Sequence, residues 1–166
     1  MLIHININGE KKKIHCAPDD MLMDVLRDAG YKSVKCGCDT TNCGLCTVWL
    51  EGKSVLSCSV PAMRCNNKNV TTLEGVQEEA KLIGSLLVDE GADQCGFCSP
   101  GLIMNIIAMK KELKNPTEQD ILHYLAGNLC RCTGYEGQYR AIKNYLAVTQ
   151  ANYKLFEKGE VIEGVR

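Results

Sequence analysis

Three features are scarce in this 166-residue sequence, and each scarcity excludes a class of partner. Aromatic residues make up only 5% of the chain, which leaves no stacking platform for nucleic-acid bases. The formal net charge is −1, so the chain has no excess of positive charge for a nucleic-acid backbone. No apolar run approaches the roughly 18 residues that a membrane-spanning helix requires. We therefore expect neither a nucleic-acid partner nor a membrane partner.

The N-terminus lacks the signals of secretion. It has no basic segment, no apolar stretch and no cleavage site of the kind that forms a secretory leader. We therefore expect a cytoplasmic protein. Disulfides are rare in that compartment, so its cysteines are expected to serve as metal ligands or as free thiols.

Cysteine, in contrast, is abundant, with 11 residues, and eight of them fall into two sets of four. The first set has the spacing Cys-x4-Cys-x2-Cys followed by a distant fourth, which is typical of plant-type [2Fe–2S] ferredoxins. The second set joins a Cys-x2-Cys to a Cys-x-Cys across a helix-length stretch. The first set is Cys38, Cys43, Cys46 and Cys58, and the second is Cys95, Cys98, Cys130 and Cys132. Two such sets predict two clusters and a protein that relays electrons.

Structural zinc is the main alternative for both sets, because paired cysteines also form tetrahedral sulfur sites. The first set favours iron, since zinc sites usually pair two short knuckles, whereas this set has three clustered cysteines and an isolated fourth. Taken alone, the second set suits zinc as well as iron. Its presence beside the first set favours a [2Fe–2S] cluster there too.

Three cysteines remain outside these sets. Cys36 could replace Cys38 as a ligand, but only Cys38 gives the x4 spacing of the ferredoxin motif. Cys16 and Cys65 are interpreted as ordinary thiols.

The first 75 residues carry strand and turn signals. Apolar and polar residues alternate over residues 2–8 and end at Asn8-Gly9, a dipeptide that favours a hairpin turn. Residues 19–30 have acidic residues at the front, apolar residues at helical spacing and a closing glycine. The other strands are expected at residues 12–16, in a hairpin over residues 46–58 with its turn at 51–53, and at residues 70–73. Strands around one helix, with a cysteine loop, predict a β-grasp, ferredoxin-like domain over residues 1–75.

Helical patterns replace the strand patterns after residue 75. Four helices are expected: over residues 76–90, from Ser99, from Pro116 and over residues 138–148. Helix packing could bring the loop before the second helix to the loop between the third and fourth, and so unite the second cysteine set. The fold class is thus α+β: a ferredoxin-like domain, a four-helix-bundle [2Fe–2S] domain over residues 76–150, and a polar tail over residues 151–166.

Four motifs carry a family resemblance. They are Cys38-x4-Cys43-Gly44-Leu45-Cys46-Thr47-Val48, Thr71-Thr72-Leu73-Glu74-Gly75, Gln94-Cys95-Gly96-Phe97-Cys98-Ser99-Pro100-Gly101, and Gly127-Asn128-Leu129-Cys130-Arg131-Cys132-Thr133-Gly134-Tyr135. Together with the order of the domains, they resemble the small iron–sulfur subunit of the xanthine dehydrogenase family of molybdenum hydroxylases. The resemblance extends to about residue 150.

The resemblance implies a set of cofactors and partners. It implies two [2Fe–2S] clusters in this chain, a large subunit with a molybdenum–pterin cofactor, and usually a medium subunit with FAD. Electrons would leave the molybdenum singly, reach the cluster on the second cysteine set first and then the ferredoxin-like cluster. Gln94, and Cys132 through its backbone, match family positions that touch the pterin.

The first motif departs from the family at two positions. Asp39 and Thr41 stand where the family commonly has glycine. Because the potential of a cluster depends on hydrogen bonds to its sulfurs and on nearby charge, we expect the potential of this cluster to differ from that of its relatives.

The chain shows no Ser-His-Asp, paired-carboxylate or phosphate-loop constellation, so we expect no catalytic residue in it. The leading interpretation is the non-catalytic iron–sulfur subunit of an oxidoreductase complex. The alternatives are a free-standing two-cluster ferredoxin shuttle and a zinc-stabilised interaction module. The loop over residues 39–46 looks most like that of anaerobic xanthine dehydrogenases, which favours xanthine or a related purine as the substrate of the complex.

Overall fold

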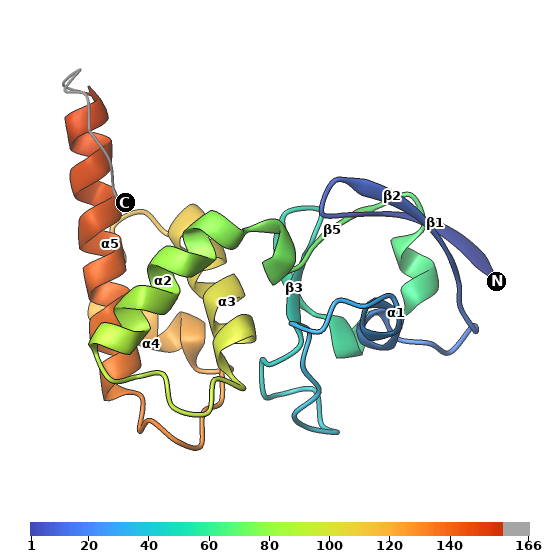
Figure 1. The fold of residues 1–166 in the computed structure, drawn as a ribbon, viewed down its shortest axis with the longest axis horizontal. Helices are drawn as coiled ribbons and strands as arrows, with labels where there is room; N and C mark the ends of the chain where they lie inside the picture. Colours follow the sequence, from blue (N-terminus) through green and yellow to red (C-terminus); the bar gives the residue numbers. More distant parts are fainter. Residues whose placement is uncertain (158–166) are drawn as a thin grey trace.

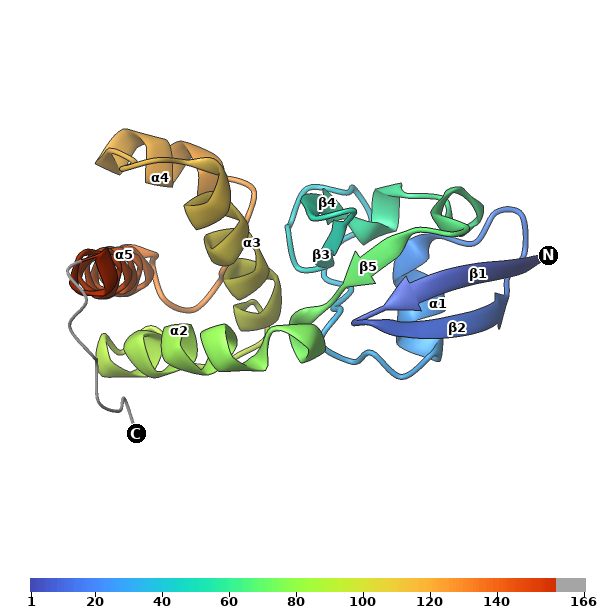
Figure 2. The same cartoon turned by 90° about the horizontal axis from the view of Figure 1, so that it is seen from above.

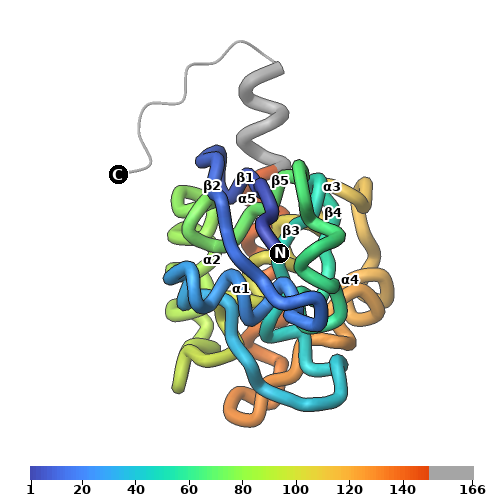
Figure 3. Tube along the Cα trace, turned by 90° about the vertical axis from the view of Figure 1, so that its right-hand side faces the viewer, coloured from blue at the N-terminus to red at the C-terminus, as the bar shows by residue number. Residues whose placement is uncertain are grey.

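The computed structural model describes residues 1–157, with side chains as far as residue 149. A β-rich part, from β1 (Leu2–Ile7) to β5 (Asn69–Thr71), and a helical part, from α2 (Gln77–Asp89) to α5 (Glu136–Glu157), lie next to each other along the longest axis (Figures 1 and 2). Viewed from the β-rich end in Figure 3, the strands and α1 lie in front of the helices. The predicted order of the two parts is confirmed.

The β-rich part is a five-stranded sheet in the order β2-β1-β5-β3-β4. β1 and β5 are parallel, and the other neighbouring strands are antiparallel. Ile3, Ile5 and Ile7 alternate along β1 and are all buried, as the period of two in a strand requires. The strands are β1 (Leu2–Ile7), β2 (Glu10–His15), β3 (Thr47–Leu50), β4 (Lys53–Leu56) and β5 (Asn69–Thr71), and the helix packed in this part is α1 (Leu22–Asp28).

Both predicted hairpins are present, and their turns have the expected backbone. Asn8 and Gly9 have φ angles of 53° and 88°, and Glu51 and Gly52 have φ angles of 52° and 78°. Two successive residues with positive φ form a type I′ turn, whose twist matches that of the flanking strands.

The helical part contains the four predicted helices: α2 (Gln77–Asp89), α3 (Ser99–Glu112), α4 (Glu118–Leu125) and α5 (Glu136–Glu157). Thr117 and Asp120 form the expected capping box at the start of α4. α3 is buried around most of its circumference because it contacts α2 and α4 on one side and β3 and β4 on the other.

Trp49 connects the two parts. It comes from β3, yet it is 5% exposed and belongs to the hydrophobic core of the helices. Its indole Nε1–H donates to the Met104 carbonyl of α3 at 3.1 Å, which satisfies its buried polar group. The hydrophobic core of the helices therefore extends to β3 at this contact.

The last helix is longer than expected. α5 extends over Glu136–Glu157, whereas the pattern predicted a helix over residues 138–148. The first seven residues of the predicted tail, 151–157, thus belong to this helix, and residues 158–166 lie outside the described residues. Among the described helices, none combines the length and the apolar character needed to cross a bilayer.

Candidate iron-sulfur centres

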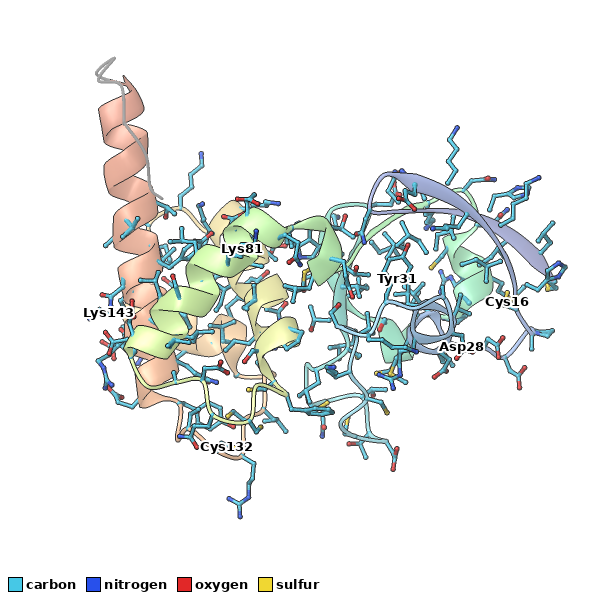
Figure 4. All side chains as sticks on the ribbon, viewed as in Figure 1. Cys16, Asp28, Tyr31, Lys81, Cys132 and Lys143 are labelled. Atoms are coloured by element: carbon cyan, nitrogen blue, oxygen red, sulfur yellow. The ribbon has the colours of Figure 1, made fainter. Side chains whose placement is uncertain are left out.

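Two loops of the helical part bring the second cysteine set together. The α2–α3 loop carries Cys95 and Cys98, and the α4–α5 loop carries Cys130 and Cys132. Both loops lie at the lower edge of the molecule in Figure 1, where Figure 4 labels Cys132. Gly96, with a φ of 72°, turns the first loop between its two cysteines.

The four cysteines form two close pairs. The Sγ atoms of Cys95 and Cys132 are 3.6 Å apart, and the thiols of Cys98 and Cys130 also interact with each other. Two sulfurs that share one tetrahedral metal at about 2.3 Å lie about 3.8 Å apart. Each pair therefore suits one metal, and two adjacent pairs suit two bridged irons. Among the side chains that the structure describes, no three from His, Cys, Asp or Glu are grouped about a single metal-ion position.

The surroundings shift the pKa values of these thiols in different directions. Burial raises the pKa of Cys130, but donation from the Thr133 hydroxyl and the backbone N–H groups of Cys132 and Thr133 outweighs it and lowers the pKa to about 7. Burial and the neighbouring Cys130 raise the pKa of Cys98 to about 11. The contact with Cys95 raises the pKa of Cys132. The site thus already favours a thiolate, the form that binds a metal, at Cys130.

The first cysteine set shows the same arrangement in pairs. Cys38 contacts Cys43, and Cys46 contacts Cys58. Backbone N–H groups of Asn42 and Thr40 donate to the Cys38 sulfur and lower its pKa to about 6. Burial, followed by the contact with Cys46, raises the pKa of Cys58 to about 12.

Local hydrogen bonds position the distant fourth cysteine of this set. The Ser57 hydroxyl donates to the Cys46 carbonyl at 2.7 Å, and the Ser57 backbone N–H donates to the same oxygen at 3.3 Å. Ser57 opens the short 3-10 turn Ser57–Ser59 after β4, so these bonds place Cys58 against Cys46. The described residues thus bring all four predicted cysteines of the first set into one neighbourhood.

The two cysteine sites are connected directly. The Leu129 backbone N–H donates to the Cys43 carbonyl at 2.9 Å, and Leu129 immediately precedes Cys130. The Asn128 side chain donates to the Gly44 carbonyl at 3.4 Å and is itself oriented by Asn105, whose Nδ2 lies 2.7 Å from the Asn128 Oδ1. One hydrogen bond and a few covalent bonds therefore separate a predicted ligand of one site from a predicted ligand of the other.

The two residues predicted to touch a partner's pterin are both exposed. Gln94 is exposed, directly before Cys95, and Cys132 is exposed as well. Both line the small hollow between the two cysteine loops.

Cys36 is exposed, whereas Cys16 and Cys65 are buried in the β-rich core. Figure 4 shows Cys16 far from Cys132.

Two neighbours of the second site were missed from the sequence. Gln138 donates from Nε2 to the Cys98 sulfur at 3.7 Å, and the Thr133 hydroxyl donates to the Cys130 sulfur at 3.2 Å. Thr133 follows Cys132 directly, so its place in the motif was a usable signal. The only signal for Gln138 was a polar residue within the apolar pattern of its helix.

Comparison with known proteins decides between the metals. Residues 5–71 match the 2Fe-2S iron-sulfur cluster binding domain, and residues 72–143 match the [2Fe-2S] binding domain. The chain is 40% identical to the nicotinate dehydrogenase small FeS subunit of Eubacterium barkeri over 144 residues, which cover 85% of this chain and 92% of the relative. It is 44% identical to the xanthine dehydrogenase iron-sulfur-binding subunit of Escherichia coli O157:H7 over 138 residues, which cover 81% and 87%.

The chain belongs to the small [2Fe–2S] subunits of the xanthine dehydrogenase family. It is accordingly an iron–sulfur subunit of an oxidoreductase and has two [2Fe–2S]-binding domains. The predicted fold class and cofactor are confirmed, and zinc is set aside.

A solved structure supports the same family. Quinoline 2-oxidoreductase from Pseudomonas putida 86 has a chain that matches with a TM-score of 0.82 and 31% identity, over 97% of this chain and 98% of that one. Aldehyde oxidoreductase of Megalodesulfovibrio gigas is 35% identical over 150 residues, but the match spans only 16% of that relative. The small-subunit unit thus also occurs as part of a much longer chain.

Thr41, one of the two departures from the family in the first motif, has an unusual backbone conformation. Its φ is 53°, a left-handed conformation that is costly for a β-branched residue, and its hydroxyl donates to the Thr40 carbonyl at 2.8 Å. Thr41 thus holds an unfavourable backbone conformation within the loop whose N–H groups donate to Cys38. We predict that Thr41→Gly shifts the potential of the ferredoxin-type cluster while the iron content stays intact.

Asn115→Gly is the matched control for this prediction. Asn115 also has a positive φ of 52°, but it lies in the α3–α4 loop. Redox titration of both variants, with iron analysis, should show a shifted potential for Thr41→Gly alone. Equal potentials in the wild type and in Thr41→Gly would contradict the prediction.

Proposed function

We propose that this chain is the electron-transfer subunit of a molybdenum hydroxylase, passing electrons from a molybdenum–pterin site through two [2Fe–2S] clusters to FAD or another acceptor. The observation that carries this proposal is the hydrogen bond between the Leu129 N–H and the Cys43 carbonyl. It joins the two cluster loops in one rigid contact, which a relay needs and two independent carriers do not.

The protein's part in the relay is to hold distances and to exclude water. Each [2Fe–2S] cluster, when bound, accepts and releases one electron. The glycine-lined contact of Gly44 with Gly101 and Asn128 lets the two cluster loops approach at backbone distance. Cys43 and Cys46 are 6% and 3% exposed, so water has little access to their side of the first cluster.

The exposure of the cysteines supports an order for the relay. Cys95, Cys132 and Gln94 lie at the exposed rim of the second site, where a partner's pterin could be contacted by Gln94 and by the backbone of Cys132. We therefore place the second cluster, on Cys95, Cys98, Cys130 and Cys132, next to the pterin. The first cluster, on Cys38, Cys43, Cys46 and Cys58, then faces the acceptor.

The partners are proposed to be a large subunit with the molybdenum–pterin cofactor and a medium subunit with FAD. The long aldehyde oxidoreductase relative supports this, because most of that chain has no counterpart here. A cytoplasmic location fits the cysteines, since all eleven are free of disulfides.

The proposed substrate of the complex is xanthine or a related purine. The loop over residues 39–46 and the 44% identity to a xanthine dehydrogenase subunit support it. Nicotinate is the second candidate, because a nicotinate dehydrogenase subunit is 40% identical over a slightly longer match.

The test is anaerobic absorption of the complex purified from native cells. Xanthine, nicotinate and dithionite are each added to a separate sample. Bleaching of the visible bands by xanthine supports the relay and the purine together, and bleaching by nicotinate alone supports the relay with the second substrate. Bleaching by dithionite only, with no molybdenum in the preparation, would remove the molybdenum hydroxylase from consideration and favour the free ferredoxin shuttle.

A further inference from the structure

The four cysteines of the second site receive unequal side-chain hydrogen bonds. Gln138 donates to the Cys98 sulfur, and Thr133 donates to the Cys130 sulfur. Cys98 and Cys130 form one of the two close pairs, whereas Cys95 and Cys132 contact each other at the exposed rim. Both donors therefore act on the same, inner half of the site.

Gln138 is an unusual residue for its position. It is only 4% exposed, although it is polar, and it lines a cavity of about 450 Å³ together with Leu102, Ile121 and Ile142. An aliphatic side chain would suit these neighbours, and a buried amide is costly unless its groups are hydrogen-bonded. Its Nε2 is directed instead at the Cys98 sulfur, which points to a role at the cluster rather than in packing.

The Thr133 hydroxyl is held in a fixed place by a local network. It accepts from the Tyr135 backbone N–H at 3.2 Å while it donates to the Cys130 sulfur. The Tyr135 hydroxyl in turn accepts from the Cys130 backbone N–H at 3.0 Å. These three bonds close a ring around Cys130, so the hydroxyl is oriented before a cluster is bound.

Donors at a cluster sulfur act on its redox equilibrium. One-electron reduction adds negative charge to the cluster and its sulfurs, so a hydrogen-bond donor stabilises the reduced form more than the oxidised form. We propose that Gln138 and Thr133 are positioning residues that raise the reduction potential of the second cluster through Cys98 and Cys130. This inference requires the cluster at the second site, but it does not depend on molybdenum as the electron source.

Three substitutions test the proposal in the complex purified with both clusters. Gln138→Met removes the N–H donor at similar length, and Thr133→Val removes the hydroxyl at equal size, whereas Thr133→Ser keeps it. We expect Gln138→Met and Thr133→Val each to disfavour reduction of the second cluster about tenfold, a shift of about 59 mV to lower potential. Thr133→Ser should keep the wild-type potential, because serine retains the hydroxyl donor.

Ile142→Val is the packing control, because Ile142 lines the same cavity as Gln138 one turn along α5. It should leave both potentials unchanged. The measurement is a potentiometric titration with dithionite and mediators, followed by EPR and accompanied by iron analysis. The potential of the first cluster, measured in the same titration, is the internal reference.

Full iron content with an unchanged potential in both Gln138→Met and Thr133→Val would overturn the proposal. If Gln138→Met loses iron, the Thr133 pair decides alone, and equal potentials for valine and serine would overturn it. Because the titration uses no substrate, a failed molybdenum assignment would leave this result unaffected.

Discussion

Gly101→Ala is expected to destabilise the protein by about 3 kcal/mol, although alanine is the better helix former. Gly101 is buried in α3 beneath the first cluster loop. A Cβ atom at this position would lie 2.9 Å from the Leu45 Cα and 3.0 Å from the Leu45 carbonyl oxygen, and it would collide with the Gly44 carbonyl oxygen. These are backbone atoms, so no side chain can move aside to relieve the overlap.

The same substitution should disturb the contact between the two cluster loops. Gly44 follows Cys43, whose carbonyl accepts from Leu129, and pushing Gly44 away from α3 strains that hydrogen bond. Gly84→Ala in α2 is the control, because a Cβ there meets nothing within 4 Å. That variant should be about 0.5–1 kcal/mol more stable than the wild type. Thermal unfolding of the cluster-loaded protein by circular dichroism measures both, and a Gly101→Ala protein as stable as the wild type would disprove the expected clash.

Local sequence signals predicted most of the fold because they act over a few residues. Asn8-Gly9 requires two positive φ angles, and the structure has them. Thr117 and Asp120 form a capping box that is readable from their spacing. The two cysteine sets were likewise readable, from the spacing of their members along the chain.

Contacts between distant segments were beyond local signals. Nothing near Trp49 in the chain shows that it enters the core of the helices, because its partner Met104 lies 55 residues away. The bond between Leu129 and Cys43 depends on how the two parts pack, and so does the burial of Gln138. The extension of α5 to Glu157 was missed because residues beyond 148 carry little apolar pattern, although the helix continues.

The choice between Cys36 and Cys38 as ligand is open to a decisive substitution. Cys38→Ser should remove the first cluster, so that iron falls from about four to about two atoms per chain. Cys36→Ser should keep all of it. The reason is local: Cys38 contacts Cys43 and accepts from the backbone N–H groups of the loop, which lower its pKa to about 6, whereas Cys36 is exposed before Gly37.

Iron and sulfide analysis, with EPR of the dithionite-reduced protein, measures the outcome for both variants. In Cys38→Ser the signal of the second cluster should persist, because its cysteines lie on the loops of the helical part. Loss of the first cluster in Cys36→Ser, with retention in Cys38→Ser, would make Cys36 the ligand. The x4 spacing and the N–H groups directed at Cys38 would then need another explanation. Cys36 and Cys38 flank Gly37, where a Cβ would overlap the Leu45 side chain, so the loop between them has little room to exchange one sulfur for the other.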